Sequence, residues 1–180
     1  QFVLMEGERE RNLTSAHDQR FFLGAYNLSI DQFDCPIEQP FELNKEQRIG
    51  LLTHPSWLIA HSKNTDTNPI TRGKWIRERL LAGHVPDVPI TVDAVVPEDP
   101  HKTLRERFQK TEQQDCWRCH KKMNPLGMTF EAYDDFGRFR TTDRISGKPI
   151  DSSGQLDSTG VQSLDGKVEN AVELMKRLGQ

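Results

Sequence analysis

The sequence predicts a mainly α, loop-rich domain built from short helices. Several segments place apolar residues three or four positions apart, which is the spacing of an amphipathic helix. Proline-rich connectors separate these segments, with four prolines from His84 to Pro100 inclusive. A third observation is a Cys-x-x-Cys-His motif at residues 116–120, whose side chains share one face when the motif is helical. Together these features predict short helices joined by irregular connectors.

The motif itself consists of Cys116, Cys119 and His120, and Cys-x-x-Cys-His is the attachment signature of a c-type haem. On one helical turn the two thiols can reach the vinyl groups on one edge of a porphyrin, and the adjacent imidazole becomes the proximal iron ligand. A redox Cys-x-x-Cys or half of a zinc site are the alternatives. A zinc site needs a second pair of ligands, whereas the only other cysteine is Cys35, and no βαβ pattern accompanies the motif. The sequence therefore predicts a c-type cytochrome-like domain with short helices around one covalently attached haem c, His120 being an iron ligand.

Composition agrees with a bound apolar group. Hydrophobic residues make up 34% of the 180 residues, and with the 12 glycines added the share stays below the roughly 45–50% of a typical globular chain. Either a porphyrin supplies the missing apolar core, or the chain has apolar contacts within a larger assembly. The net charge of -3 and the lack of a long Lys/Arg cluster argue against nucleic acid as a partner. No apolar run approaches the ~18–20 residues of a membrane span.

The first 47 residues carry few functional signals. Residues 15–28 place Phe21, Phe22, Ala25 and Leu28 at a spacing that predicts a short amphipathic helix. An irregular connection follows, in which Cys35 is expected to be an unpaired, half-buried residue. The chain opens on Gln1 without a signal peptide. Because haem attachment of this type occurs outside the cytoplasm, we expect an exported or periplasmic protein from which a leader or a longer N-terminal region has been removed.

Two helices are predicted between residues 48 and 83. Pro55 can open the first, because the amide that proline lacks is not needed in the first turn, and this helix should extend to Ser62. Asn68 or Thr71 could cap a second helix that runs to Leu81, and Gly83 should end it. From His84 to Pro100 the prolines predict an extended connector.

The next helix should lead to the Cys-x-x-Cys-His motif. Asp99-Pro100 is typical of a cap followed by proline in the first turn, and Thr103-x-x-Glu106 offers a second start as a capping box. Asn124, Pro125, Leu126 and Gly127 should form a turn that stops the motif helix. A carbonyl of that turn can accept the other ring N–H of His120 and so fix its tautomer, which places Pro125 among the residues expected at the cofactor. A short helix at 129–136 should pack aromatic side chains against the porphyrin. A turn-rich tail precedes a last helix at 164–178.

Five spaced motifs resemble the planctomycete-type cytochrome c domain, long catalogued as a domain of unknown function. In chain order they are Arg48-x-Gly50-Leu51-Leu52-Thr53-His54, Asn68-Pro69-x-x-Arg72-Gly73-Lys74-Trp75, Cys116-x-x-Cys119-His120-x-x-Met123-Asn124-Pro125-Leu126-Gly127-Met128-x-Phe130-Glu131, Asp135-x-Gly137-Arg138-x-Arg140 and Ile150-Asp151-x-x-Gly154. One departure is Asn124, where Asp is the commoner residue of the family.

The resemblance covers residues 48–160 and implies a haem domain inside a larger secreted multidomain protein. Residues 1–47 are then expected to end a preceding domain, and the helix within residues 161–180 to begin a following one. The chain given would be a fragment or a processed piece of that protein. The resemblance implies haem binding and electron transfer, but it does not supply a substrate.

The second axial position of the iron decides what the haem can do. The candidate ligands are His54, His61, His84, Met123 and Met128. Met123 is rejected because it follows His120 by only three residues, and Met128 is disfavoured because a tight turn lies between it and the motif. His54 is the predicted ligand, since it lies on a separate element and the resembling segments often carry His, Met or Gln there. The alternative is that His54 is a surface or cap residue.

Three arginines are candidates for the haem propionates, which guanidinium groups bind through paired hydrogen bonds. They are Arg72, Arg138 and Arg140. Each could equally form an ion pair with Glu131, Asp134 or Asp135.

The most direct functional interpretation is an electron-transfer module that carries single electrons between a redox partner protein, or other domains of a larger assembly, and its haem. This interpretation leans away from an enzyme. The alternative is a haem redox enzyme of the peroxidase or small-ligand-binding kind, in which the distal site is open or weakly held.

Overall fold

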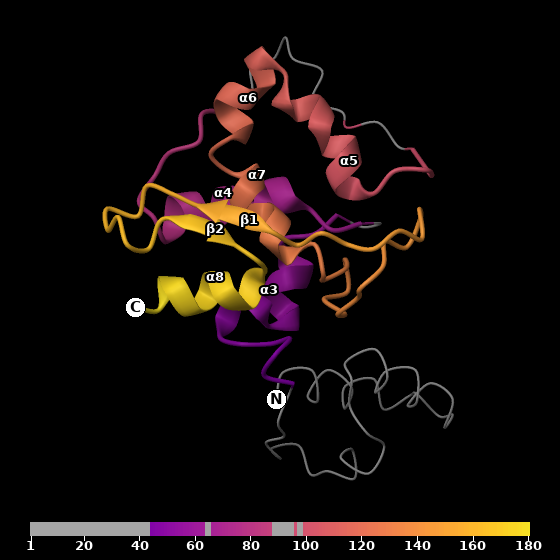
Figure 1. Cartoon of the computed structure of the whole chain (residues 1–180), viewed down its shortest axis with the longest axis horizontal. Helices are drawn as coiled ribbons and strands as arrows, with labels where there is room; N and C mark the ends of the chain where they lie inside the picture. The colour runs from indigo at the N-terminus through magenta and orange to yellow at the C-terminus, as the bar shows by residue number, and fades with distance from the viewer. Residues whose placement is uncertain (1–43, 64–65, 88–95, 97–98) are drawn as a thin grey trace.

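The computed structural model describes residues 44–63, 66–87, 96 and 99–180. Its 3₁₀ helices (η), α-helices and strands follow one another as drawn in Figure 1: η2 Leu51–Thr53, α3 Pro55–Ala60, α4 Pro69–Arg79, α5 Leu104–Phe108, η3 Gln109–Glu112, α6 Gln114–His120, α7 Asn124–Gly127, η4 Met128–Phe130, β1 Gly154–Leu156, β2 Gly166–Val168 and α8 Ala171–Leu178. The expected helix at 15–28 and Cys35 lie outside the described residues.

The prediction of a mainly α fold is wrong, because the described chain is a small mixed domain. β1 and β2 form an antiparallel two-stranded sheet in which Gly154 pairs with Val168 and Leu156 pairs with Gly166. The helix expected at 164–178 therefore starts only at Ala171. The sequence did not reveal where the strand ends and the helix begins, because buried Val168 belongs to β2 but has the helical spacing of the apolar residues in α8. Asn170 marks the true start, since its side chain accepts a hydrogen bond from the Glu173 amide.

The capping signals correctly located three helix starts. His54 and Pro55 begin α3. Asn68 begins α4, and its side-chain oxygen accepts the Thr71 amide at 3.3 Å. Thr103 and Glu106 form the predicted capping box at the start of α5. These signals were reliable because each satisfies amide groups that a helix start leaves unpaired, whatever packs around it.

Two short-range predictions between residues 124 and 136 are wrong. Residues 124–127 form α7 instead of a turn, with Pro125 in the first helical turn where proline is tolerated. The helix expected at 129–136 ends at Phe130, because the Asp134 carboxylate accepts the amides of Phe136 and Arg138 and closes a turn. Of the three aromatic residues of this segment, Phe130 and Tyr133 are buried in the main apolar core, whereas Phe136 is exposed.

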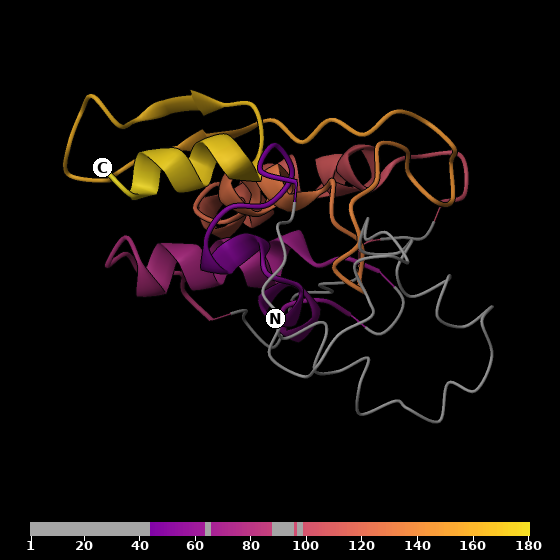
Figure 2. The ribbon, with the colours of Figure 1, turned by 90° about the horizontal axis from the view of Figure 1, so that it is seen from below.

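Glycines allow α7 to lie at the centre of the molecule, between α4 and β1 (Figures 1 and 2). A Cβ atom on Gly73 of α4 would lie 1.9 Å from the Met123 carbonyl oxygen, and one on Gly127 would lie 1.8 Å from the Pro69 carbonyl oxygen. On the other side, a Cβ atom on Gly154 of β1 would lie 2.1 Å from the Pro125 carbonyl oxygen. The backbones touch at three points where only glycine fits, and these contacts fix the position of α7.

The main apolar core joins residues from both ends of the described chain. Its buried members are Leu52, Trp57, Leu58, Ile76, Leu126, Phe130, Tyr133, Leu156, Val168, Ala171 and Leu174. Val168, Ala171 and Leu174, from the segment expected to begin a following domain, are thus members of this core. A smaller cluster consists of buried Leu104, Phe108 and Met128, with Ile70 and Val96 packed against it. None of the described helices is long and apolar enough to cross a membrane.

Candidate haem-attachment site

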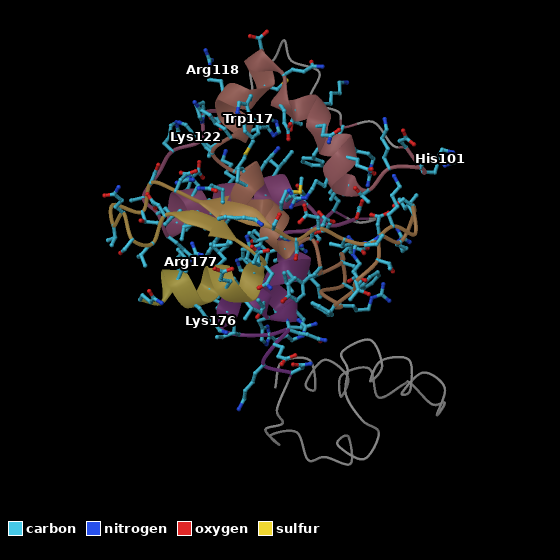
Figure 3. The ribbon with its side chains drawn as sticks, viewed as in Figure 1. His101, Trp117, Arg118, Lys122, Lys176 and Arg177 are labelled. Carbon is cyan, nitrogen blue, oxygen red and sulfur yellow. The ribbon has the colours of Figure 1, made fainter. Side chains whose placement is uncertain are left out.

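Helix α6 carries all three residues of the Cys-x-x-Cys-His motif at its C-terminal end. Cys116 and Cys119 are free thiols, and both are half-buried, as is His120. Residues three apart on a helix project from the same face, so the two sulfurs lie on one side of α6. Arg118, between them in sequence, is exposed and extends outward (Figure 3). The helix therefore presents two thiols and an imidazole within one turn.

The orientation of His120 is set by Asn124. Nδ1 of His120 lies 2.9 Å from the side-chain oxygen of Asn124, which is buried. The contact follows from the local fold. Helix α6 ends at His120, the Met123 amide donates a hydrogen bond to the His120 carbonyl, and α7 begins at Asn124. With Nδ1 engaged, Nε2 is the nitrogen through which the ring can ligate a metal.

The acceptor at Nδ1 of His120 is thus the side-chain oxygen of Asn124, whereas the sequence predicted a carbonyl of residues 124–127. The Pro125 carbonyl faces Gly154 of β1. The sequence could have identified Asn124 as the partner of His120. The two residues lie four positions apart, and Asn124 has the only polar side chain of residues 124–127.

A buried apolar cluster adjoins the segment that leads into α6. The smaller apolar cluster of Leu104, Phe108 and Met128 adjoins η3, which connects α5 to α6 (Figure 1). Phe108 is linked to the motif through polar contacts as well, because its carbonyl accepts the Thr111 hydroxyl and Thr111 contacts Asn124. Two free thiols and an imidazole with an acceptor on Nδ1 form the donor set that a covalent haem requires. The residues present fit that group.

A conventional metal site was the main competing interpretation. Within the described part of the chain, no group of three or more His, Cys, Asp or Glu side chains could hold a metal ion.

The structure does not bring His54 to His120. His54 lies at the N-cap of α3, where its Nδ1 accepts the Ser56 amide at 3.3 Å, and burial lowers its pKa. Figure 1 shows α3 and α6 at opposite ends of the described domain. The cap role, which was the alternative for His54, is the one this geometry shows.

The remaining candidates for the second axial position occupy different surroundings. Nδ1 of His61 lies 2.8 Å from the Trp57 carbonyl, and the His61 ring stacks on the Trp57 ring at 4.5 Å. His84 is exposed. Met123 and Met128 are both buried, and Met128 is the one that belongs to the smaller apolar cluster.

Arg72, a candidate for the propionates, is fully buried and serves the fold. Its guanidinium donates to the hydroxyls of Ser62 and Thr67 and to four backbone carbonyls, those of Leu58, Phe130, Tyr133 and Asp134. Burial lowers its pKa to about 10. It therefore ties the end of α3 to the segment that follows η4. The sequence indicates only that Arg72 is buried, because it lies four residues before Ile76 on one face of α4. Its hydrogen-bond partners cannot be read from that spacing.

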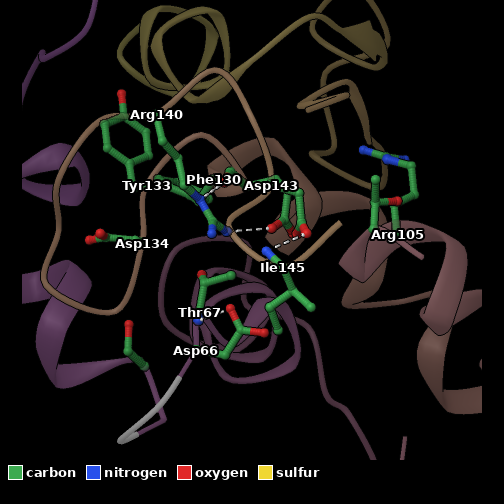
Figure 4. Close-up of polar contacts among 12 residues, drawn as sticks. Asp66, Thr67, Arg105, Phe130, Tyr133, Asp134, Arg140, Asp143 and Ile145 are labelled. Carbon is green, nitrogen blue, oxygen red and sulfur yellow. Dashed lines mark hydrogen bonds and ion pairs between the residues drawn. The ribbon is translucent and has the colours of Figure 1, made fainter. Parts of the chain in front are cut away.

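Arg138 and Arg140 form ion pairs, which was the alternative open for both. Nε of Arg138 lies 2.6 Å from Asp134, and Arg140 lies 3.0 Å from Glu131. Figure 4 shows Arg140 within a polar centre that also contains Asp66, Thr67 and Asp143. Burial raises the pKa of Glu131 to about 7, against the opposing effect of Arg140. Sequence analysis had not singled out Glu131 beyond its pairing.

Residues 48–143, more than half of the chain, match the PSCyt3 family, described as "Protein of unknown function (DUF1588)". This is a planctomycete cytochrome-c-related domain. The matched region contains α6, Asn124 and the buried arginines, whereas β1, β2 and α8 lie beyond it. Comparisons with curated proteins and with solved structures give no match.

Proposed function

Since this chain belongs to the PSCyt3 family of proteins of unknown function (DUF1588), we propose that it binds one haem c covalently and carries single electrons. The observation that carries the proposal is the arrangement on α6. Cys116 and Cys119 are free thiols on one helical face, and the next residue, His120, has an acceptor on Nδ1. This combination suits covalent haem better than a zinc or disulfide role, because zinc would need further ligands near the pair.

Each residue has a distinct role in the proposal. Cys116 and Cys119 hold the haem through thioether bonds, and His120 binds the iron through Nε2. Asn124 keeps the ring of His120 oriented. When bound, the haem supplies an iron centre that is reversibly oxidised and reduced by one electron.

Attachment of this kind requires reduced thiols and an exported chain, so we also propose a periplasmic location or another site outside the cytoplasm. The donor or acceptor of the electron is a redox protein or a further domain of a larger assembly.

The decisive experiment is to export the full chain in a host that attaches haem c and to measure its intact mass. We expect the mass of the polypeptide plus one haem, together with an absorption spectrum that survives acid–acetone extraction. Replacing both Cys116 and Cys119 by Ser should abolish the added mass. His120→Ala should change the spectrum, while His101→Ala, at an exposed histidine, should leave it unchanged. A bare polypeptide mass, from a host that matures a control cytochrome, would contradict the proposal.

Electron transfer is tested on the same material. A potentiometric titration should follow a one-electron Nernst curve. Binding of carbon monoxide or cyanide at low concentration would instead favour the haem enzyme over the carrier, because it requires an exchangeable axial position.

A further inference from the structure

Three hydrogen bonds, two of them buried and the one at His120 partly buried, connect His120 to the backbone of α5. The Thr111 hydroxyl lies 2.6 Å from the Phe108 carbonyl oxygen, and the Asn124 side-chain nitrogen lies 2.8 Å from the Thr111 hydroxyl. The Asn124 side-chain oxygen lies 2.9 Å from Nδ1 of His120. Thr111 is 7% exposed and Asn124 is 6% exposed, so water competes little for these groups.

The direction of every bond in this series follows from its first member. A carbonyl oxygen can only accept, so the Thr111 hydroxyl must donate its single proton to Phe108. Thr111 is then an acceptor toward Asn124, which means that the amide nitrogen faces Thr111. The amide oxygen therefore faces His120, and Nδ1 of His120 must carry a proton.

We infer that Thr111 and Asn124 are positioning residues that hold His120 in the Nδ1–H tautomer, with the lone pair on Nε2. The tautomer is set by the fold itself, before any group binds. The consequence for haem iron rests on the proposed function: an acceptor on Nδ1 makes the imidazole a stronger electron donor and lowers the reduction potential.

The position of Asn124 depends on the central helix. Asn124 is the first residue of α7, and α7 is fixed by the backbone contacts of Gly73, Gly127 and Gly154. Thr111 lies in η3, on the opposite side of His120 in the sequence. Two elements that are separate in the sequence therefore act on one ring nitrogen, α7 directly through Asn124 and η3 through the contact of Thr111 with Asn124.

A matched pair of variants separates this role from simple packing. Thr111→Val keeps the shape of the side chain but removes both hydrogen bonds of the hydroxyl, so the Asn124 amide loses the partner that orients it. Thr111→Ser keeps the hydroxyl. In ¹⁵N-histidine NMR spectra of the full chain without haem, near pH 8, we expect Nδ1–H for wild type and Thr111→Ser, and a shift toward Nε2–H for Thr111→Val. The Nε2–H tautomer in the wild-type protein would overturn the inference, whether or not haem attaches.

In the haem-loaded protein the same variants should differ in reduction potential. Thr111→Val should have a higher potential than Thr111→Ser, because the acceptor at Nδ1 is less well held. Asn124→Asp should lower the potential, since a carboxylate is the stronger acceptor, and Asn124→Leu should raise it. If the haem-free chain does not fold, these reduction potentials test the role of Thr111 and Asn124 instead of the NMR spectra. Equal potentials for the Val and Ser variants would overturn the role of Thr111, while a chain that takes up no haem would contradict only the proposed function.

Discussion

At the scale of single residues, Glu131 is unusual among the described carboxyl groups. One of its oxygens pairs with Arg140 at 3.0 Å, while the other is buried without a hydrogen-bond partner among the described residues. Burial is the main reason that its pKa rises to about 7. An unpaired buried oxygen is costly when it carries charge and less costly when it is protonated. The protonated form is therefore the one that favours the folded state.

We predict that Glu131 makes the protein less stable as the pH rises. The folded pKa lies above the ordinary value of 4.5 for a glutamate carboxyl, so between about pH 4.5 and 7 the folded state binds more protons than the unfolded state. The free energy of unfolding should fall over this window by up to about 3 kcal/mol. Glu131→Gln keeps an oxygen for Arg140 and should remove this fall, as urea unfolding at a series of pH values will show.

A control with the opposite sign is available on α5. The hydrogen bond from Lys148 lowers the pKa of Glu106, so ionised Glu106 favours the folded state. Glu106→Gln keeps the capping box, in which Gln can replace Glu. Above pH 4.5 it should slightly lower the free energy of unfolding. If Glu131→Gln and wild type show the same pH profile, Glu131 does not titrate in this window.

At the scale of elements, the crossing of α4 and α7 determines where Asn124 lies. Gly73 is in the middle of α4, where helix propensity alone would favour alanine by about 1 kcal/mol. A Cβ atom there would meet the Met123 carbonyl oxygen at 1.9 Å. Packing therefore outweighs propensity at this position.

We predict that Gly73→Ala lowers the free energy of unfolding by at least about 2 kcal/mol, because backbone atoms cannot yield as side chains do. The His120–Asn124 hydrogen bond should weaken as well, since α7 must move. Gly179→Ala is the matched control, as a Cβ atom there meets its nearest atom at 3.5 Å, and it should be close to neutral. Chemical denaturation and the His120 tautomer measure the two effects. A stabilised Gly73→Ala protein would mean that the helices do not cross here.

The same elements show how far sequence reasoning reaches. Caps such as Thr103 and Asn68 were predictable because they act within one turn of the chain. That the Cys-x-x-Cys-His motif lies on a helix was predictable, because it depends on local spacing. The role of Arg72 and the pairing of β1 with β2 were not, because both depend on partners far away in the sequence. Arg72 donates to carbonyls around residue 130, and Gly154 meets Val168 across a long loop.

For the molecule as a whole, the C-terminal segment completes the domain. Val168, Ala171 and Leu174 have no exposed surface and lie in one core with Leu58 and Phe130. In Figure 1, α8 and the two strands cover one side of the central helix α7. The family match ends at residue 143, yet the core it contains is closed by residues beyond it. Cooperative stability of the motif region should therefore depend on α8.

Leu174→Ala tests this dependence. Removing a fully buried leucine should lower the free energy of unfolding by about 2–5 kcal/mol, and a single cooperative unit transmits that loss to every probe. Tryptophan fluorescence, which reports on Trp57, Trp75 and Trp117, and the absorption of the proposed haem should then shift to the same lower midpoint. Val161→Ala, at a half-exposed side chain, should change the free energy of unfolding by less than about 0.5 kcal/mol with either probe. If α8 instead began an independent domain, Leu174→Ala would leave the haem transition unchanged, because no buried contact would connect the two.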